Sequence, residues 1–152
     1  MRTVVSNYFE SKVRLEKVTE EGMQAKFNEL YVVNAMSFSE CESKMVEYIS
    51  QYAQGEFDIL TEAHAKYKEI FYSDKEDEEL WYRASVVFIT IDEKSMKQKR
   101  SKNVYLVQGK DIESARMNVE EVMNGSMVDY SIEGLHETAI QDIIGNAETK
   151  AD

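Results

Sequence analysis

The chain has 152 residues, 43% of them hydrophobic, which is enough for one ordinary core or two small fused cores and too apolar for a disordered chain. No apolar run reaches the length of a membrane span, and the N-terminus lacks the apolar block of a secretory signal. We therefore expect a cytoplasmic protein that begins at Met1 and has no membrane partner. The single cysteine, Cys41, excludes an internal disulfide, so stability must come from packing.

The formal net charge of -11 argues against a nonspecific coat on duplex DNA, because such binding neutralises many phosphates with Lys and Arg. The charge is unevenly distributed, since residues 94–102 contain five basic side chains and no acid. A local basic patch steers a polyanion even when the whole molecule repels it. Its members are Lys94, Lys97, Lys99, Arg100 and Lys102.

The first elements form a predicted hairpin. Apolar and polar side chains alternate over residues 8–18, which is typical of a half-buried strand. Residues 19–22 are a polar turn, and residues 26–36 return as a second strand rich in aromatic and β-branched side chains. We expect these two strands to pair.

A helix and a third extended segment follow the hairpin. Ser37 is a suitable N-cap with Glu40 three residues later, the arrangement of a capping box, and apolar residues then recur at helical spacing. These signals predict a helix over residues 38–52 that packs one apolar stripe on the hairpin. Residues 56–72 continue as a long extended or bent segment, so the first unit is ββαβ with a tail.

Residues 74–79, DKEDEE, separate this unit from the rest of the chain. They lack the ligand spacing and the glycine of a calcium loop, so we interpret them as a solvated linker.

The chain then repeats itself. Placing Trp81 on Tyr8 aligns the strands at an offset of 73 residues, and the second strand and helix align at an offset of 74, with Asp111 on the cap Ser37. Three elements in the same order favour an internal duplication over chance. We predict an α+β fold of two ββαβ units, each with an antiparallel sheet covered by one helix, in one compact pseudo-symmetric domain. The ranges are 1–73 for the first unit, 74–80 for the acidic linker, 81–145 for the second unit and 146–152 for a short polar tail. Whether the units share one sheet is left open.

The duplication also indicates which face of each sheet is buried. Apolar positions shared by both copies mark the core under the helices. These are Phe9, Val13, Leu15, Tyr82, Val86 and Phe88.

The opposite face combines aromatic and basic side chains, which suits stacking of unpaired bases and contact with phosphate. An alternative is that Tyr8 and Trp81 cover a seam between the units, and Val87 and Ile89 suggest that part of this face is an interface. The candidate binding residues on this face are Tyr8, Lys12, Arg14, Trp81 and Arg83.

Residues 94–102 form the predicted tip of the second hairpin and are the remaining candidate site. The tip is either a nucleic-acid-binding arm or an ordinary solvated hairpin end that guards against edge pairing. The corresponding turn of the first unit is acidic, so the molecule has unlike ends and head-to-tail association is a further option.

We find no residues arranged for catalysis, a metal or a cofactor. His64 and His136 have no partner ligands at metal spacing, and Cys41 lies on the core stripe of a helix, where a small buried residue is needed. There is no glycine-rich phosphate loop and no serine elbow. We therefore expect a protein that is not an enzyme.

The segments YFESKVRLEK, KYKEIF, WYRASVVFITIDEKS, VYLVQGKDIESA and MVDYSIEGLHETAIQDII resemble a family of domains of unknown function from Bacteroidetes and their phages, including crAss-like phages. The resemblance extends from about Tyr8 to Ile144. It implies a place among phage replication genes and single-stranded DNA binding, and it transfers no specific site residue.

Two functional hypotheses remain. The first is a non-catalytic single-stranded DNA-binding protein in phage or bacterial DNA metabolism, whose tail at 146–152 contacts a partner. The second is a structural or protein-interaction factor, either a homo-oligomer or an acidic inhibitor of a host nucleic-acid-binding surface. The second hypothesis predicts a mass that depends on concentration and no affinity for oligonucleotides.

Overall fold

The computed structural model describes residues 2–4, by their backbone alone, and residues 7–145. The predicted tail at 146–152 lies outside the described residues. The chain forms two compact units. We call residues 2–4 and 67–138 unit 1, and residues 7–66 and 139–145 unit 2.

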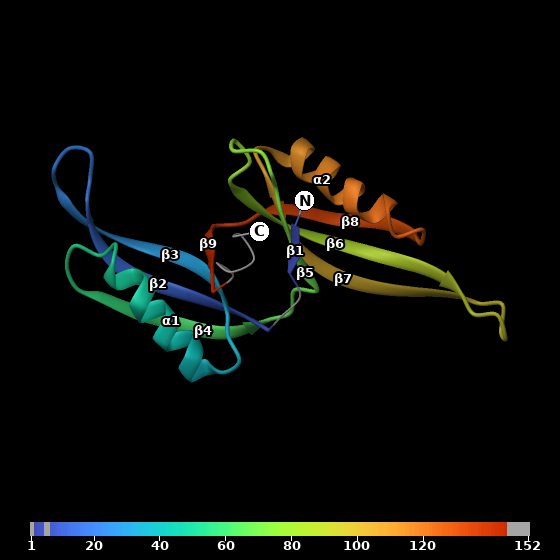
Figure 1. The fold of residues 1–152 in the computed structure, drawn as a ribbon, viewed down its shortest axis with the longest axis horizontal. Helices are drawn as coiled ribbons and strands as arrows, with labels where there is room; N and C mark the ends of the chain where they lie inside the picture. Colours follow the sequence, from blue (N-terminus) through green and yellow to red (C-terminus); the bar gives the residue numbers. More distant parts are fainter. Residues whose placement is uncertain (1, 5–6, 146–152) are drawn as a thin grey trace. The chain divides into compact units, whose positions relative to one another are not determined.

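Unit 2 is a four-stranded sheet with one helix (Figure 1). The strand order is β4-β2-β3-β9, and β9 pairs with β3 in parallel while the other neighbours are antiparallel. Its elements are β2 (Tyr8–Val18), β3 (Gln24–Asn34), α1 (Phe38–Ser50), β4 (Phe57–Ala65) and β9 (Ile140–Ile144).

Unit 1 has the same core arrangement with one more strand. The order is β1-β5-β7-β6-β8, and β5 pairs with β7 in parallel. Its elements are β1 (Arg2–Val4), β5 (Glu69–Tyr72), β6 (Leu80–Ile91), β7 (Gln98–Gly109), α2 (Ile112–Asn124) and β8 (Asp129–Glu137). The predicted α+β fold of duplicated ββαβ units, each sheet covered by one helix, is confirmed.

The two repeats exchange their last strands. The segment predicted as one extended piece over 56–72 is two strands: β4 stays in the sheet of the first repeat, whereas β5 joins β7 of the second repeat. Conversely, β9 leaves the second repeat and joins β3 of the first. The sheets are therefore separate, and each is completed by a strand from the other half of the sequence.

Local sequence explains the shared elements. In β2 the side chains of Phe9, Val13 and Leu15 are buried while Lys12 and Arg14 between them are exposed, as the alternation predicts. Both helices begin at the predicted caps. The Oγ atom of Ser37 accepts a hydrogen bond from the backbone N–H of Glu40 at 3.1 Å.

The second cap is a full capping box at Asp111. Its carboxylate accepts from the Ser114 N–H at 2.8 Å, and the Ser114 hydroxyl accepts from the Asp111 N–H at 3.2 Å. Together these contacts satisfy two amide groups that would otherwise have no partner in the first helical turn.

Each unit has its own core between helix and sheet. The predicted core residues are confirmed: Phe9, Val13 and Leu15 pack under α1, and Tyr82 and Val86 pack under α2 with a half-buried Phe88 beside them.

A bulge at the same place in both repeats supports the duplication. In the first repeat, the pairing of β2 with β4 shifts between Lys12 and Val13, so Leu60 has no paired residue on β2. In the second repeat, the pairing of β6 with β8 shifts between Ser85 and Val86, so Glu133 has no paired residue on β6. A bulge redirects side chains near it.

Candidate nucleic-acid interface

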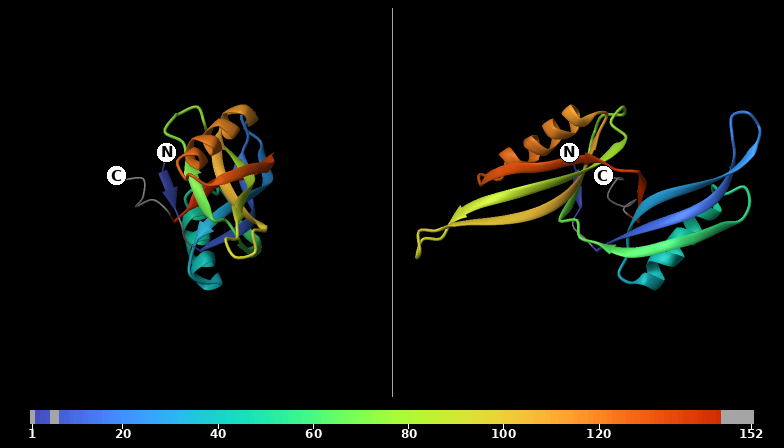
Figure 2. Two further views of the ribbon diagram at one scale, coloured as in Figure 1. Left: turned by 90° about the vertical axis from the view of Figure 1, so that its right-hand side faces the viewer. Right: turned by 180° about the vertical axis from the view of Figure 1, so that it is seen from behind.

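The β6–β7 hairpin extends beyond the rest of its sheet (Figure 2). Strand β8 pairs with β6 only as far as Ile89, opposite Asp129, whereas β6 and β7 remain paired to Ile91 and Gln98. All residues from 90 to 102 are exposed. We call residues 90–102 the basic arm.

The turn of the arm is held by its own hydrogen bonds. The Asp92 carboxylate accepts from the Lys94 N–H at 2.9 Å, and the Asp92 carbonyl accepts from the Met96 N–H at 2.7 Å. Met96 has a φ of 56°, a left-handed conformation, and 76% of its surface is exposed. The turn thus presents an apolar side chain among cations.

The cations lie on both faces of the arm. Lys99 is paired with Thr90, while Arg100 and Lys102 are paired with Ile89 and Val87, whose side chains lie on the other face. Arg100 forms an ion pair with Glu133 at 3.1 Å. Within the described part of the chain no ion pair occupies the four lysines of the arm, Lys94, Lys97, Lys99 and Lys102.

Unlike the exposed arm, the two aromatic candidates are buried. Only 2% of Tyr8 and 2% of Trp81 is exposed, and the Trp81 ring meets the edge of Tyr72 at a centroid distance of 5.4 Å. The rings of Tyr8 and Trp81 therefore present no open face to a base in this structure. From the sequence, burial of these two rings is only one of two alternatives, because it depends on contacts outside the strand's own sequence.

Two of the three basic candidates on the strands form hydrogen bonds with other side chains. Arg83 donates to the Tyr67 hydroxyl at 2.9 Å, with its guanidinium 5.8 Å from the ring centroid. Arg14 and Lys12 are exposed on β2, and the Arg14 guanidinium donates to the Asn28 side chain at 3.3 Å. Lys12 and Arg14 belong to unit 2, whereas Arg83 and the arm belong to unit 1.

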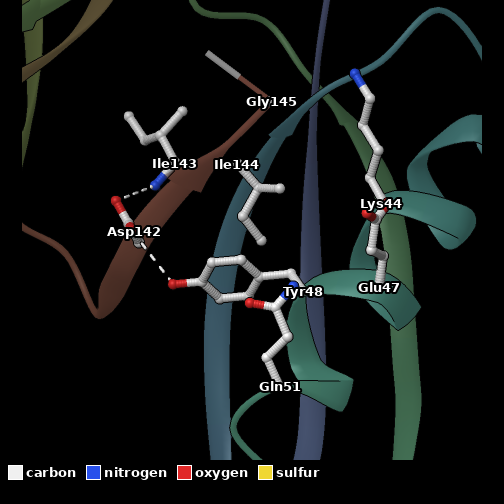
Figure 3. A pocket seen from close by; sticks show the side chains of 8 residues that line it. All are labelled: Lys44, Glu47, Tyr48, Gln51, Asp142, Ile143, Ile144 and Gly145. Atoms are coloured by element: carbon white, nitrogen blue, oxygen red, sulfur yellow. Dashed lines mark hydrogen bonds between the residues drawn. The ribbon is translucent and has the colours of Figure 1, made fainter. Parts of the chain in front are cut away.

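A pocket of about 380 Å³ lies between α1 and β9 (Figure 3). Several of its polar side chains already have hydrogen-bond partners. The Tyr48 hydroxyl donates to the Asp142 carboxylate at 3.3 Å, and the Lys44 ammonium donates to the Asn34 carbonyl at 2.7 Å. Burial, and then the charge of Asp142, raise the pKa of the Tyr48 hydroxyl. The Tyr48–Asp142 contact joins α1 to the exchanged strand β9, and the Lys44–Asn34 contact joins α1 to the end of β3.

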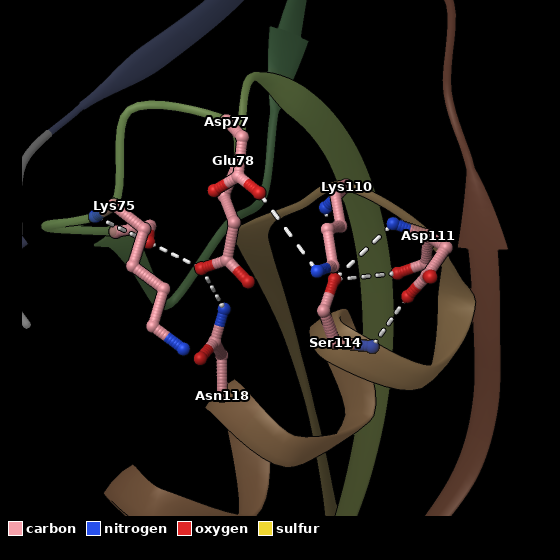
Figure 4. A network of polar contacts seen from close by, with 8 residues as sticks. Lys75, Asp77, Glu78, Lys110, Asp111, Ser114 and Asn118 are labelled. Atoms are coloured by element: carbon pink, nitrogen blue, oxygen red, sulfur yellow. Dashed lines mark hydrogen bonds and ion pairs between the residues drawn. The ribbon is translucent and has the colours of Figure 1, made fainter.

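The acidic segment contains a buried carboxylate (Figure 4). Glu78 is 3% exposed, accepts from the Asn118 amide at 3.0 Å and bonds to the Ser73 hydroxyl. Burial opposes its ionisation, but these hydrogen bonds and the charges of Lys75 and Lys110 outweigh it and lower its pKa. Residues 74–77 and 79 are exposed, as predicted for a solvated segment, but Glu78 is buried and holds the segment to α2, and all six residues lie within unit 1.

The other residues considered for catalysis or metal binding have the surroundings of structural residues. The His64 ring packs on the rings of Phe9 and Phe38, at centroid distances of 4.4 Å and 4.8 Å. Cys41 is buried, and burial followed by the Glu62 carboxylate raises the pKa of its thiol to about 12. Across residues 2–4 and 7–145, no three His, Cys, Asp or Glu side chains are grouped to hold a metal ion. In the same ranges no helix has the length and apolarity to span a membrane.

A hollow at the base of the arm is a feature that sequence reasoning missed. It measures about 600 Å³, and we call it the root hollow. Its residues come from three separate segments that only the fold brings together, so no local motif marks it. It is lined by Ile89, Gln98, Met123, Asn124, Met127, Val128, Asp129 and Tyr130.

These features define a duplicated α+β protein with exchanged strands and an exposed basic hairpin. The chain belongs to the family described as "Domain of unknown function (DUF4494)", whose model matches residues 7–146. The expected membership of a family of domains of unknown function is thus confirmed. No curated protein and no solved structure matches the chain.

Proposed function

We propose that this protein binds single-stranded nucleic acid without catalysing a reaction, and that the basic arm makes the main contact. The observation that carries the proposal is the arm itself, an exposed hairpin with five cations, four of them lysines outside any ion pair in the described chain. Such a group of ammonium ions on a narrow hairpin attracts phosphates of a flexible strand.

Two further features favour a single strand over a duplex. The net charge of -11 repels a long duplex, which would bring many phosphates near the acidic surface. The arm also exposes Ile91 and Met96 at 65% and 76%, and apolar side chains contact the faces of unpaired bases, which a duplex stacks inside.

The setting proposed for this activity is phage or bacterial DNA metabolism in the cytoplasm. Its support is the resemblance of the chain to domains from Bacteroidetes and their phages. The buried Tyr8 and Trp81 do not supply the stacking surface, so we assign phosphate contact to the arm and give Lys12, Arg14 and Arg83 no primary role.

The test compares two triple variants with the same change in charge. One is Lys97→Gln, Lys99→Gln, Lys102→Gln on the arm; the control is Lys26→Gln, Lys66→Gln, Lys68→Gln at exposed positions elsewhere. Affinity for labelled oligo-dT is measured by fluorescence anisotropy over a range of salt. The arm variant should lose affinity and reduce the slope of log K against log salt by about 2, since each phosphate contact contributes about 0.7.

Equal losses in both variants would show that net charge alone matters and would remove the arm from the model. No binding of oligo-dT by the wild-type protein at low salt would refute the proposed function.

A second candidate function is protein interaction or self-association. It is favoured by the large exposed methionines, because flexible thioether side chains suit adaptable protein interfaces. Sedimentation across a range of concentrations tests it, and a constant monomer mass would count against self-association. The side chains concerned are Met23, Met36, Met96, Met117 and Met127.

A further inference from the structure

We propose that Asn124 is a site of intramolecular deamidation, in which the backbone nitrogen of Gly125 attacks the Asn124 side chain and ammonia is released. Asn124 is the last residue of α2, where the chain turns toward β8 (Figure 1). Asn124 and Gly125 form the only Asn-Gly pair in the sequence. This modification site goes beyond the proposed function and does not depend on it.

The reaction closes a five-membered ring and needs only water besides the protein. The Gly125 nitrogen forms a bond to Cγ of Asn124, its proton passes through water to Nδ2, and the Cγ–Nδ2 bond breaks to release ammonia. Water then opens the cyclic imide. Cleavage of the new bond leaves an aspartate at position 124, whereas cleavage of the backbone C–N bond leaves an isoaspartate, in which the chain continues through the side chain.

Gly125 makes the attacking nitrogen accessible. Glycine has no β-carbon, so its nitrogen is open to the neighbouring side chain and the backbone rotates easily into the geometry of ring closure. The Gly125 N–H donates to the Val122 carbonyl at 3.3 Å, which is a long and therefore weak hydrogen bond. Asn124 and Gly125 are both exposed, and residues 125–128 belong to no helix or strand. Rotation of Asn124 out of the last helical turn therefore exposes no core side chain.

Tyr130 supplies a hydrogen-bond donor to the reacting group. Its hydroxyl donates to Oδ1 of Asn124 at 2.7 Å. Negative charge develops on this oxygen as the nitrogen adds to Cγ, and a donor already in place stabilises that charge, as in an oxyanion hole. The Tyr130 ring packs against the core of unit 1, so the fold holds the donor in position. Both residues line the root hollow, which gives solvent access to the reacting atoms.

Either product adds one negative charge at a defined place. The charge lies at the C-terminal end of α2, where the helix dipole disfavours an anion. The hollow that Asn124 lines is also lined by Gln98, at the base of the basic arm. Deamidation is therefore a slow and irreversible change of charge next to the arm.

Two other asparagines serve as internal references. Asn28 on β3 is exposed, and its Oδ1 accepts from the Arg14 guanidinium at 3.3 Å, but the β-carbon of Glu29 shields the next backbone nitrogen. Asn118 lies within α2, is 8% exposed and donates its amide to the Glu78 carboxylate at 3.0 Å. Neither combines an exposed amide with an accessible nitrogen, so both should keep their amides.

The experiment incubates the full-length protein in mildly alkaline buffer and follows each asparagine by mass spectrometry after cleavage at glutamate. The peptide of residues 122–133 then contains only Asn124, that of residues 22–29 only Asn28, and that of residues 114–120 only Asn118. Replacement of NH₂ by OH should raise the mass of the 122–133 peptide with time, and chromatography should resolve an aspartate and an isoaspartate form. The other two peptides should not change.

Two variants test the roles of the neighbouring residues. Gly125→Ala fits the fold, because φ at this position is -75° and the added β-carbon meets only the Val122 carbonyl, at 3.5 Å. It should lose the mass gain. Tyr130→Phe keeps the ring and removes the hydroxyl, and it should slow the gain roughly threefold to tenfold, the effect of one hydrogen bond. Circular dichroism verifies that both variants are folded.

Three results would overturn the inference. A 122–133 peptide that gains mass in urea and not in the folded protein would show that the fold protects Asn124. Equal rates in wild type and Gly125→Ala would exclude ring closure by the Gly125 nitrogen. A faster gain in Tyr130→Phe would show that the hydroxyl restrains the amide instead of activating it. None of these results bears on nucleic-acid binding, which the arm variants test separately.

Discussion

Ser11 provides a sharp test of the packing argument, because its side chain is an unpaired hydroxyl in a core. Its exposed fraction is 0%, and its Oγ atom has no hydrogen-bond partner within the described residues. The equivalent position in the second repeat is Ala84, also 0% exposed. The duplicated fold therefore accommodates alanine at this site, and we expect Ser11→Ala to stabilise unit 2.

The magnitude follows from the cost of burying a polar group. A buried hydroxyl without a partner costs about 1–3 kcal/mol, while removing one oxygen loses a fraction of that in packing contacts. We expect a net gain of about 1 kcal/mol, which raises the melting temperature by about 2–4 °C if the chain unfolds cooperatively. The reverse change, Ala84→Ser, should destabilise unit 1 by about 1–3 kcal/mol.

Urea denaturation followed by far-UV circular dichroism measures both variants. The only tryptophan, Trp81, lies in unit 1, so comparing its fluorescence with the circular dichroism shows whether the effect of Ser11→Ala is confined to unit 2 or extends to the whole chain. A loss of stability above about 0.5 kcal/mol in Ser11→Ala would refute the reasoning, because it would mean that the hydroxyl has a bonding partner such as a buried water.

Two further predictions concern buried ionisable groups. The pKa of Glu78 is lower in the folded than in the unfolded chain, so its contribution to stability is present above the unfolded value and is lost as pH falls through the folded value. Glu78→Gln should therefore be less stable than wild type at neutral pH, and the difference should shrink as the pH is lowered below the unfolded pKa of a glutamate, measured by urea denaturation; a difference that does not change with pH would contradict this. Cys41 is fully buried with a thiol pKa of about 12, so a thiol reagent at pH 8 should label it in urea and not in the native protein. Fast labelling of native protein would show that α1 opens readily or is packed differently.

Several parts of the candidate site follow from local sequence. Five cations within residues 94–102 of a predicted hairpin had to be exposed, because a charged hairpin end has no core to enter. The structure places all five in the arm. Their role in binding stays a prediction.

Other parts depend on contacts between distant segments. Trp81 packs against Tyr72 of β5, which comes from the other repeat, so the alternation around Trp81 cannot show that the ring is buried. Glu78 is similar: in a run of acidic residues it looks solvated, yet Asn118 of α2 bonds to it. The root hollow combines the arm, α2 and β8, none of which is distinctive alone.

The sequence by itself determined the two hairpins, the two capped helices, the core face of each sheet and the duplication. These features rest on side-chain periodicity and on caps, which act over a few residues. The tertiary structure alone decided that β5 and β9 change sheets and which side chains this buries. Several distant segments have similar strand patterns, so more than one strand pairing is compatible with the sequence. Which strands pair depends on the packing energy of the whole chain rather than on any local signal.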